Sequence, residues 1–536
     1  MKTKTTDKNV REAILKLIEA DPKSIAEIAT INRKYAKKLG IEVARNSDIL
    51  LVYREELAAK RIAENKDFER LLRRRSVRTM SGIAPVAVLT KPFACPGKCA
   101  YCPTEKDVPQ SYLSNEPAVM RAIRCGYDPY KQVSDRLRSL ENNGHEPTKV
   151  ELIVIGGTWS VLPNDYQYWY VTSCFKAANE FGLAKEKQAR IRKNTSLQKL
   201  KEILLVEQKK NEKAKYKIIG LTLETRPDYI DDKEILEMRE FGCTRVELGV
   251  QAIDEDILKI NKRGHGIEKI VEATALLRGY GLKITYHLMP GLPGSTPEKD
   301  FEMFKQLFSD SRFQPDQIKF YPTVVTKGSL LYKWWKQGKY QPYTNEQLEK
   351  LIVDCKQIIP PYVRIIRLIR DIPGESIVAG NVITNLRQIM QQKGVQCGCI
   401  RCREAKDVQI KDYELRITQY SAANGEEYFI EYCSADKKTL YGFSRLFLSK
   451  NKNNQLKYTA IIRELHVYGE LVSIGGDKKV QHSGLGRQLI EQSELIASNN
   501  DFNKMTIISG VGVRGYYRKF GYKLVGTYMQ KNLKRP

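Results

Sequence analysis

The chain has 536 residues, of which 42% are hydrophobic and 29% charged, and its formal net charge is +27. This length allows two or three domains with hydrophobic cores. No apolar run is long enough to span a bilayer, and the stretch MKTKTTDKNVREAILK is too polar for a signal peptide, so we expect a cytoplasmic protein with no membrane association. The charge favours nucleic acid as a partner, although solvated lysine-rich surfaces would also produce it.

Residues 1–80 are predicted to form a basic helical segment. They contain twenty lysines and arginines against twelve aspartates and glutamates, and they end in RLLRRRSVRTMSG. Guanidinium groups along a helix suit a phosphate backbone, so the candidate RNA-binding residues are Arg73, Arg74, Arg75 and Arg78. The alternative is an ordinary solvated helix face.

Residues 81–385 alternate short apolar runs with helical stretches, as in KVELIVIGGTWSVLP and YKIIGLTLETRPDYI. Repeated strand–helix units predict an α/β fold whose parallel sheet forms a full or partial barrel. In such barrels the chemistry takes place at the carboxyl ends of the strands. Polar residues stand at these ends here, which predicts a shared cavity: Gly156, Gly157, Thr158, Glu224, Arg226, Glu247, Gln251, His287, Lys319 and Tyr321.

The loop KPFACPGKCAYCPTEK places Cys95, Cys99 and Cys102 at spacing C-x3-C-x2-C. Six of the eleven cysteines lie in two tight clusters, a pattern of metal binding in a reducing compartment. Three thiolates would ligate a [4Fe–4S] cluster and leave one iron open for chemistry. A zinc knuckle and unrelated reduced thiols are the alternatives.

With Tyr101 between its last two cysteines, this loop resembles that of the radical S-adenosylmethionine (SAM) superfamily. The resemblance implies that the open iron binds SAM and cleaves it to a 5′-deoxyadenosyl radical.

Two further stretches of the barrel region are basic. Residues 180–217 contain twelve lysines and arginines against five acidic residues and few apolar ones, so we expect a projecting basic helix that either binds RNA or is solvated. Residues 327–395 carry KWWKQGKY and then Arg364, Arg367 and Arg370, which place positive charge beside the barrel exit.

Residues 386–410 form a linker that contains the second cysteine cluster. QCGCIRCRE places Cys397, Cys399 and Cys402 in a compact loop that suits tetrahedral zinc in a structural role. Cys355, Cys433 or a histidine could supply the fourth ligand, and free thiols are the alternative.

Residues 411–536 are predicted to form a separate α/β domain. EEYFIEYC, TLYGFSRLFL and YTAIIRELHVYG have the pattern of antiparallel strands. Gln481, Gly484 and Gly486 then precede an amphipathic helix, where backbone N–H groups can approach a pyrophosphate. This Gln-x-x-Gly-x-Gly loop and the later YYRKFGY resemble GNAT-type acetyltransferases, which implies acetyl-CoA binding.

From about residue 80 to its end the chain resembles the catalytic subunit of Elongator in its single-polypeptide form. The motifs that carry the resemblance include NEPAVMRAIRCGYDPY, GLTLETRPDYI, RVELGVQ, RELHVYG and SGVGVRGYYRKFGY. The family modifies the wobble uridine of tRNA to 5-carboxymethyluridine, which implies a tRNA substrate. The three-residue gap between Cys95 and Cys99 points to a prokaryotic-type member, for which Elongator partner subunits are not expected, and a homodimer stays open.

The resemblance implies roles for individual residues. Cys95, Cys99 and Cys102 would ligate the cluster. Lys149 would contact acetyl-CoA from the barrel side, and Tyr517 its thioester end. The CoA strand would present Glu464, Leu465, His466 and Val467, and the pyrophosphate would lie on Leu485, Gly486 and Arg487. Further candidates for cofactor binding are Gly156, Gly157, Glu224 and Gln251, and the candidate catalytic residues are Lys319, Tyr321, Tyr516 and Tyr517.

The implied chemistry begins with one electron passing to SAM. The resulting radical takes hydrogen from the acetyl methyl group, the carbon radical adds to C5 of uridine, and thioester hydrolysis leaves the carboxymethyl group. Two alternatives are a protein lysine acetyltransferase with a structural iron–sulfur cluster and a non-enzymatic RNA-binding scaffold. The basic surface argues against cationic substrates, and the two cofactor motifs argue against a scaffold.

Overall fold

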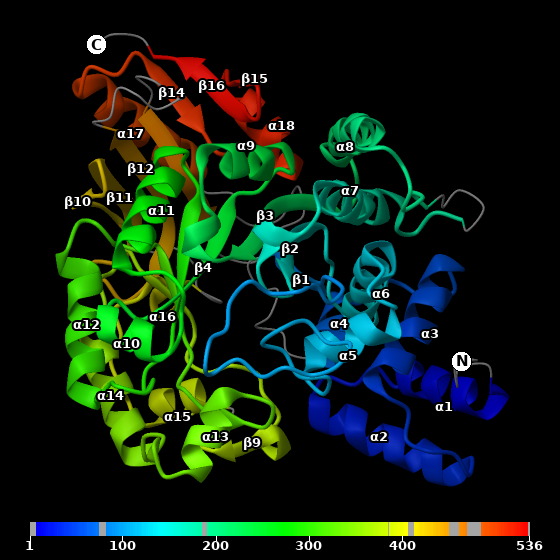
Figure 1. Ribbon diagram of the computed structural model, residues 1–536. Helices are drawn as coiled ribbons and strands as arrows, with labels where there is room; N and C mark the ends of the chain where they lie inside the picture. Colours follow the sequence, from blue (N-terminus) through cyan, green and yellow to red (C-terminus); the bar gives the residue numbers. More distant parts are fainter. Residues whose placement is uncertain are drawn as a thin grey trace.

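The computed structural model describes residues 7–73, 82–184, 190–383, 385–405, 412–449, 460–468 and 484–533 (Figure 1). A helical amino-terminal region is followed by a parallel seven-stranded sheet and then by a mixed seven-stranded sheet. The predicted α/β fold class is therefore confirmed. Within these ranges, no helix combines the length and the apolar character that crossing a membrane requires.

The amino-terminal region is a small helical unit with its own core. Ile14, Leu17, Ile49 and Phe68 are buried among its helices, so these helices pack mainly against one another. The Arg54 guanidinium donates to the Glu141 carbonyl at 2.7 Å and so ties the unit to the barrel region. The helices are α1 Lys8–Glu19, α2 Ile25–Lys38, α3 Asn46–Ala58 and α4 Lys66–Leu72.

The barrel sheet has its strands in chain order, and every neighbouring pair is parallel. Its central strands are buried on both faces, because helices cover the outside and the polar residues of the inner face line a lumen. In the described ranges β1 and β8 are the two edges and do not pair, so the barrel is partial. The strands are β1 Ile83–Leu89, β2 Lys149–Ile155, β3 Lys217–Thr225, β4 Arg245–Gln251, β5 Lys283–Leu288, β6 Gln317–Phe320 and β8 Arg364–Arg367.

Helices cover the outer face of this sheet (Figure 1). The helical segments between β1 and β8 are α5 Pro117–Arg124, α6 Pro129–Asn142, η3 Trp159–Val161, α7 Asn164–Glu180, α8 Leu197–Asn211, η5 Pro227–Tyr229, α9 Asp232–Glu240, α10 Glu255–Ile260, α11 Ile267–Gly279, α12 Pro297–Ser309, α13 Leu330–Lys336 and α14 Asn345–Ile358. After α13 and α14 the chain adds η6 Gly374–Ser376, α15 Leu386–Gln392 and α16 Ile400–Arg403, and β7 Val325–Thr326 pairs with β9 Ile377–Ala379.

The basic segment 180–217 differs from its prediction. We expected a projecting helix, but α8 packs along α7 and buries Leu200 and Leu204. Glu207, Gln208 and Asn211 are buried as well. Apolar residues that recur every fourth position gave the helix an inward face, which the high lysine content obscured.

The carboxyl-terminal sheet is antiparallel except where β13 meets β14. These two strands pair over only three residues, Ala460–Ile462 of β13. The rest of β13 diverges from β14, and the gap between them is here called the wedge. The strands are β10 Glu414–Ala422, β11 Gly425–Cys433, β12 Leu440–Ser449, β13 Ala460–Val467, β14 Lys504–Ile507, β16 Tyr528–Asn532 and β15 Lys523–Val525. The helices are α17 Leu485–Asn499, η8 Val511–Val513 and α18 Arg514–Arg518.

The carboxyl-terminal domain covers the amino ends of the barrel strands. Gly510 approaches β3 so closely that a Cβ there would lie 1.9 Å from the Ile219 carbonyl oxygen. Lys283, the first residue of β5, reaches Glu464 of β13 at 3.4 Å. The cysteine loop 95–102 follows the carboxyl end of β1, so the two predicted cofactor sites lie at opposite ends of the barrel.

Candidate active site

One cavity of about 1990 Å³ runs along the inner face of the barrel and continues into the wedge beside β13. It is lined by the first cysteine loop at one end and by α17 and α18 at the other. The predicted site residues that it brings together are Cys95, Cys99, Cys102, Lys149, Gly157, Glu224, Gln251, Lys319, Tyr321, Glu464, Leu465, His466, Val467, Gly486, Arg487, Tyr516 and Tyr517. Gly156 and Leu485 are adjacent in sequence to lining residues, whereas the second cysteine cluster and Arg73 lie outside the lining.

Two arginines face the cysteine loop. Arg263 donates to Cys99 Sγ at 3.4 Å, and Arg226 approaches the same sulfur at 4.0 Å while a bidentate pair with Asp228 holds it. A hydrogen bond from Cys102 and the charge of Arg263 lower the pKa of Cys99 to about 4, against the effect of burial. Gly97 has no room for a side chain, because a Cβ would lie 2.4 Å from Arg226.

Cys99 and Cys102 are hydrogen-bonded to each other, but the three loop thiols do not all gather as the ligands of a single ion do. Zinc–sulfur bonds of about 2.3 Å place tetrahedral ligands roughly 3.8 Å apart. Cys397, Cys399 and Cys402 gather within 4.8 Å of one another, whereas Cys95, Cys99 and Cys102 do not form such a group. The geometry of a single-ion site is therefore present at the second cysteine cluster and not at the first loop.

The strand ends beside this loop have unusual backbone. Gly156 and Gly157 have φ angles of 134° and 100°, and a Cβ on Gly156 would lie 2.2 Å from Thr90 Oγ1. Gln251 has φ 72°, a conformation that is uncommon for a residue other than glycine and that collects at functional sites. Tyr112 donates to the Glu224 carboxylate at 2.9 Å and so fixes it at the cavity wall.

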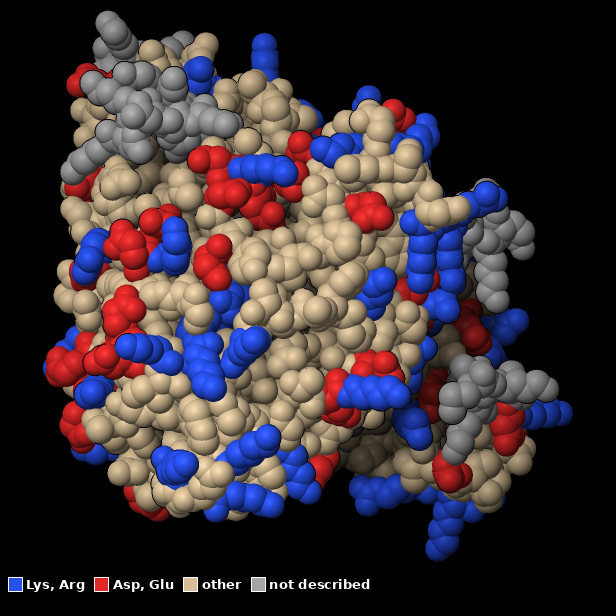
Figure 2. All heavy atoms as spheres, in the orientation of Figure 1, with Lys and Arg blue, Asp and Glu red and all other residues tan. Residues whose placement is uncertain are grey.

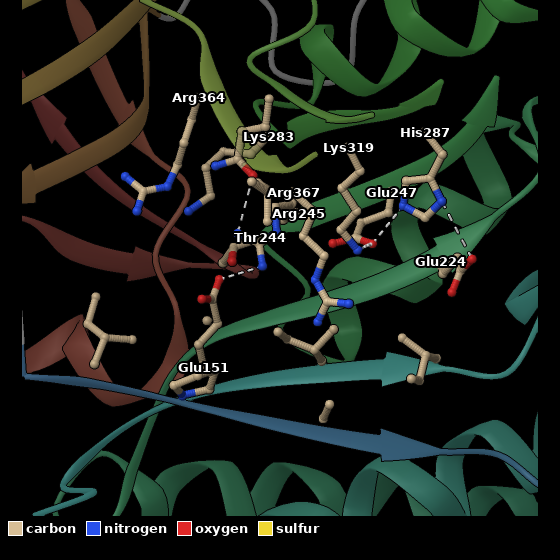
Figure 3. A pocket seen from close by; sticks show the side chains of 18 of the residues that line it. Glu151, Glu224, Thr244, Arg245, Glu247, Lys283, His287, Lys319, Arg364 and Arg367 are labelled. Carbon is tan, nitrogen blue, oxygen red and sulfur yellow. Dashed lines mark hydrogen bonds and ion pairs between the residues drawn. The ribbon is translucent and has the colours of Figure 1, made fainter. Parts of the chain in front are cut away.

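A polar row crosses the middle of the cavity (Figure 3). Lys319 forms an ion pair with Glu247, and His287 Nε2 lies 2.9 Å from the same carboxylate. The charge of Lys319 holds the pKa of Glu247 well below its usual range, although burial opposes this. The ring of Tyr321 packs edge-on against His287 at 5.5 Å between centroids.

A second polar group lies nearer the amino ends of the strands (Figure 3). Arg245 pairs with Glu151 at 2.7 Å and donates to Gln317 Oε1 at 3.3 Å. Sequence reasoning missed these residues. The available signal was the presence of charged side chains inside apolar strand runs, which mark positions that face a lumen.

The wedge beside β13 contains the predicted acetyl-CoA residues. Lys283 and Arg445 contact Glu464 at 3.4 and 3.0 Å, and their charges lower its pKa to about 2 although burial opposes this. Burial lowers the pKa of His466 to about 3, so its ring is neutral, and its Nε2 is buried without a hydrogen-bond partner in the described residues. Burial also lowers the pKa of Lys149 across the wedge.

The glycine loop opens α17 at the same wedge. Gly484 is the N-cap of the helix with φ 81°. A Cβ on Gly486 would lie 2.4 Å from the Tyr516 hydroxyl, so only glycine leaves the backbone open there. Arg487 lies over the Phe520 ring at 5.5 Å, and burial raises the pKa values of Tyr516 and Tyr517, which keeps both phenols protonated. Gln481 lies outside the described residues.

The second cysteine cluster supports a different wall of the cavity. In the described residues no fourth histidine, cysteine or carboxylate joins its three thiols, so neither Cys355 nor Cys433 completes the group. Arg387 and Arg401, the latter between Cys399 and Cys402, line the cavity and donate to the carbonyls of Ile365 and Ile366 in β8 at 2.8 and 3.1 Å.

The amino-terminal arginines are only partly described. Helix α4 ends at Leu72, and Arg73 is extended rather than helical, so the expected helical array does not continue through it. Its Nε donates to the Gly144 carbonyl at 2.9 Å, so this N–H group is already hydrogen-bonded within the protein. Arg74, Arg75 and Arg78 lie outside the described residues.

A buried ionic network joins the two domains, and sequence reasoning missed it too. Asp316, which directly precedes β6, binds Arg463 of β13 through two contacts, one of 3.0 Å. Arg463 also binds Glu427 at 2.8 Å, and Glu427 binds Arg278 of α11 at 2.9 Å. Arg445 lies 3.7 Å from Asp316, and none of these five side chains is exposed to solvent.

Comparison with known proteins adds family evidence. The radical SAM superfamily matches residues 90–307, and the radical SAM C-terminal domain matches residues 315–394. The tRNA uridine(34) acetyltransferase of Dehalococcoides mccartyi is 46% identical over 472 residues, which cover 85% of this chain and 99% of that protein. Elongator complex protein 3 of Homo sapiens is 35% identical over 558 residues, 98% of this chain and 97% of that protein.

A solved structure is similar as well. The archaeal Methanocaldococcus infernus Elp3, with residues 1–46 deleted, has a TM-score of 0.70 and 38% identity, covering 85% of this chain and 100% of that one.

Proposed function

Because the chain belongs to the radical SAM family that contains the tRNA uridine(34) acetyltransferases and Elongator complex protein 3, we propose that it converts the wobble uridine of tRNA to 5-carboxymethyluridine with SAM and acetyl-CoA. The observation that carries this proposal is the single cavity, which is lined at one end by the cysteine loop and at the other by the glycine loop of α17.

The cysteine loop fits a [4Fe–4S] cluster. Cys95, Cys99 and Cys102 supply three thiols, Arg263 donates to Cys99 and favours its ionised form, and Gly97 keeps the loop close to Arg226. When bound, the cluster and SAM supply one-electron radical chemistry. We assign Gly156, Gly157, Glu224 and Gln251 to the SAM side, since their strand ends border the loop.

The wedge beside β13 fits acetyl-CoA. In the described residues the edge from Glu464 to Val467 that faces away from β12 has no strand partner and offers backbone groups to an extended chain, and the buried His466 Nε2 lacks a partner there that a ligand could supply. Leu485, Gly486 and Arg487 begin α17, where the helix amino end and bare backbone favour a pyrophosphate. Tyr517 and Lys149 face the same wedge, so they are placed to contact the acyl end.

The polar row between these ends is suited to hold the substrate carbonyls. Although burial favours a neutral amine, Glu247 raises the pKa of Lys319, so the side chain stays an ammonium at neutral pH. Burial raises the pKa of Tyr321, so its phenol stays protonated. Both groups therefore donate hydrogen bonds, and we assign them to an oxygen of uracil or of the thioester rather than to proton abstraction.

The lining charge suits an RNA substrate. The described lining residues include seventeen lysines and arginines against seven aspartates and glutamates. This excess attracts phosphate and repels a protonated lysine side chain, which argues against the protein lysine acetyltransferase alternative. The target base has to leave its stack to enter such a cavity, as is usual for bases that enzymes modify.

The cluster at 397–402 fits zinc in its spacing and donor set, and we propose a structural ion there. The ion would hold α16, which carries Arg401, and Cys402, which Arg387 approaches at 3.9 Å, so its contribution would be to the cavity wall.

The test is mass spectrometry of wobble nucleosides after anaerobic incubation of reconstituted protein with SAM, acetyl-CoA, reductant and tRNA. A mass increase for a carboxymethyl group at that uridine is expected. Lys319→Met should lower the rate at least about 100-fold without changing acetyl-CoA affinity, because it removes a donor to developing charge. Lys305→Met, in an exposed α12 pair, is the matched control. Unmodified uridine with intact cofactor binding would refute the proposal.

A further inference from the structure

We propose that an aromatic groove next to the cysteine loop binds an unstacked nucleotide of the tRNA anticodon loop, beside the target uridine. The inference rests on the proposed function. The groove, here called the Trp334 groove, has a volume of about 380 Å³, which lies at the small end of ligand sites and suits a single nucleotide. It is lined by Ile260, Gly291, Leu292, Pro293, Gly294, Ser295, Trp334, Lys339, Tyr340, Gln341 and Tyr343.

The groove adjoins the catalytic cavity through short, rigid connections. The Leu331 amide, at the start of α13, donates to the carbonyl of Ala100 at 2.8 Å, between two cysteines of the loop. The Ala100 amide in turn donates to the Asn261 carbonyl at 3.0 Å. Met289 lines the cavity and Gly291 lines the groove, and two residues span at most about 7 Å. An RNA strand with one base in the cavity therefore has its neighbours within reach of the groove.

The groove wall is held in place by a buried carboxylate. Asp300 accepts hydrogen bonds at 2.7 Å from the Gly291 amide, the Ser295 hydroxyl and the Tyr343 hydroxyl. The Tyr340 hydroxyl donates to the Gly291 carbonyl at 2.7 Å. Gly291 has φ 78°, and a Cβ there would lie 3.3 Å from the Tyr343 ring. Because both phenols are used internally, the groove offers fixed ring faces, and ordering it on binding costs little.

The surrounding chemistry selects RNA. Residues 327–345 contain four lysines and five aromatic residues and no acidic residue. Lys336 Nζ lies over the Tyr332 ring at 4.9 Å, and that ring stacks on Trp335 at 6.1 Å. Figure 2 shows lysine and arginine side chains gathered at the foot of the molecule, over α13. Aromatic faces interleaved with cations are the means by which proteins hold single-stranded bases without reading their sequence.

The experiment is a thermodynamic cycle between the protein and the RNA. Anticodon stem-loop RNAs that each lack one loop base are titrated against the parent protein and against Trp334→Ala. We expect one missing base, next to the target uridine, to weaken binding to the parent by roughly 5- to 150-fold, the equivalent of the 1–3 kcal/mol that stacking contributes. Trp334→Ala should weaken binding of the intact RNA similarly and binding of that abasic RNA no further.

Control variants separate stacking from folding. Trp334→Phe should restore most of the affinity, and Tyr413→Ala, at an aromatic residue of the carboxyl-terminal domain that is 39% exposed, should match the parent. Lys339→Gln should reduce the salt slope of log K by about 0.7. Acetyl-CoA affinity reports that each variant is folded.

The outcomes distinguish the two proposals. The parent protein could modify uridine while the losses of RNA-binding free energy caused by Trp334→Ala and by each missing base are additive. In that case the groove does not bind a base. If Trp334→Ala changes the sedimentation of the protein and not its RNA affinity, a second copy of the chain occupies the groove, which also overturns the inference. If the parent binds RNA and leaves uridine unmodified, the proposed function fails instead.

Discussion

Replacing Asp316 by asparagine tests whether the buried ionic network holds the two domains together. The carboxylate binds Arg463 and faces Arg445, and its Oδ2 also accepts from the Ile284 amide at 2.8 Å. Without its charge, the three buried guanidiniums retain two anions, Glu427 beside Arg463 and Arg278 and Glu464 beside Arg445. Breaking a buried pair by removing one partner costs about 3–5 kcal/mol, which corresponds to a drop of roughly 6–20 °C in unfolding temperature for a cooperative unit of 150–250 residues.

Calorimetry of the parent and Asp316→Asn proteins measures this effect. Asp310→Asn is the matched control, because Asp310 pairs at 2.7 Å with an Arg312 that is 55% exposed, and such pairs contribute at most about 1 kcal/mol. Although burial opposes it, the arginines hold the pKa of Asp316 well below its unfolded value. The contribution of the Asp316 carboxylate to the free energy of unfolding is therefore complete above pH about 4. It is lost as the pH falls toward the pKa that Asp316 has in the folded protein. Equal unfolding temperatures for the two variants would refute the reasoning.

Three further predictions address the cofactor sites and RNA. Cys99→Ser should abolish the iron–sulfur absorbance of reconstituted protein, because a ligand is lost, and leave acetyl-CoA affinity unchanged in calorimetric titration. Gly486→Val should weaken acetyl-CoA binding at least about 10-fold, since its side chain would collide with the Tyr516 hydroxyl. Replacing Arg74 and Arg75 by alanine should lower the salt slope of log K for tRNA by roughly two in filter binding, because two phosphate contacts are lost.

The two cofactor-site variants each have a control within the chain. Cys125→Ser changes a buried thiol outside both cysteine clusters and should keep the absorbance. Gly374→Ala adds a methyl group where nothing lies within 4 Å and should keep acetyl-CoA affinity. Full absorbance in Cys99→Ser, unaltered affinity in Gly486→Val, or an unchanged slope in the arginine variant would each contradict the corresponding assignment.

Local patterns were sufficient to predict most of the fold. The strands that became β2, β3 and β4 are mainly apolar runs bounded by glycine or polar residues, and this pattern does not depend on distant contacts. The same holds for the cysteine loop and for Gly484 and Gly486, whose spacing is itself the signal. The prediction for α8 was wrong because two leucines, four residues apart, are enough to bury one face of the helix although most of its other residues are lysine or polar.

Residues whose role depends on pairing between distant segments could not be found in this way. Arg463 has no local partner for its charge, and its contacts to Asp316 and Glu427 exist only after the domains have docked. Glu151 and Arg245 likewise meet only when β2 and β4 share one lumen. Their charges inside apolar runs indicated an unusual environment but not which partner would satisfy them.

The geometry of the barrel explains why the domain interface matters for chemistry. Strands of four to nine residues, such as β6 and β3, span roughly 13–30 Å, so the cysteine loop and the wedge at β13 are separated by about that distance along the lumen. On the proposed function, the group held at the wedge and the group held at the loop would have to come together through this lumen, past Arg245 and Lys319. The lumen continues into the wedge only while β13 remains packed against the amino ends of the barrel strands. The contacts of Asp316 with Arg463 and of Lys283 with Glu464 lie at that junction. A variant that loosens them should therefore slow uridine modification even where each cofactor still binds, which would distinguish a passage between two sites from two independent active sites.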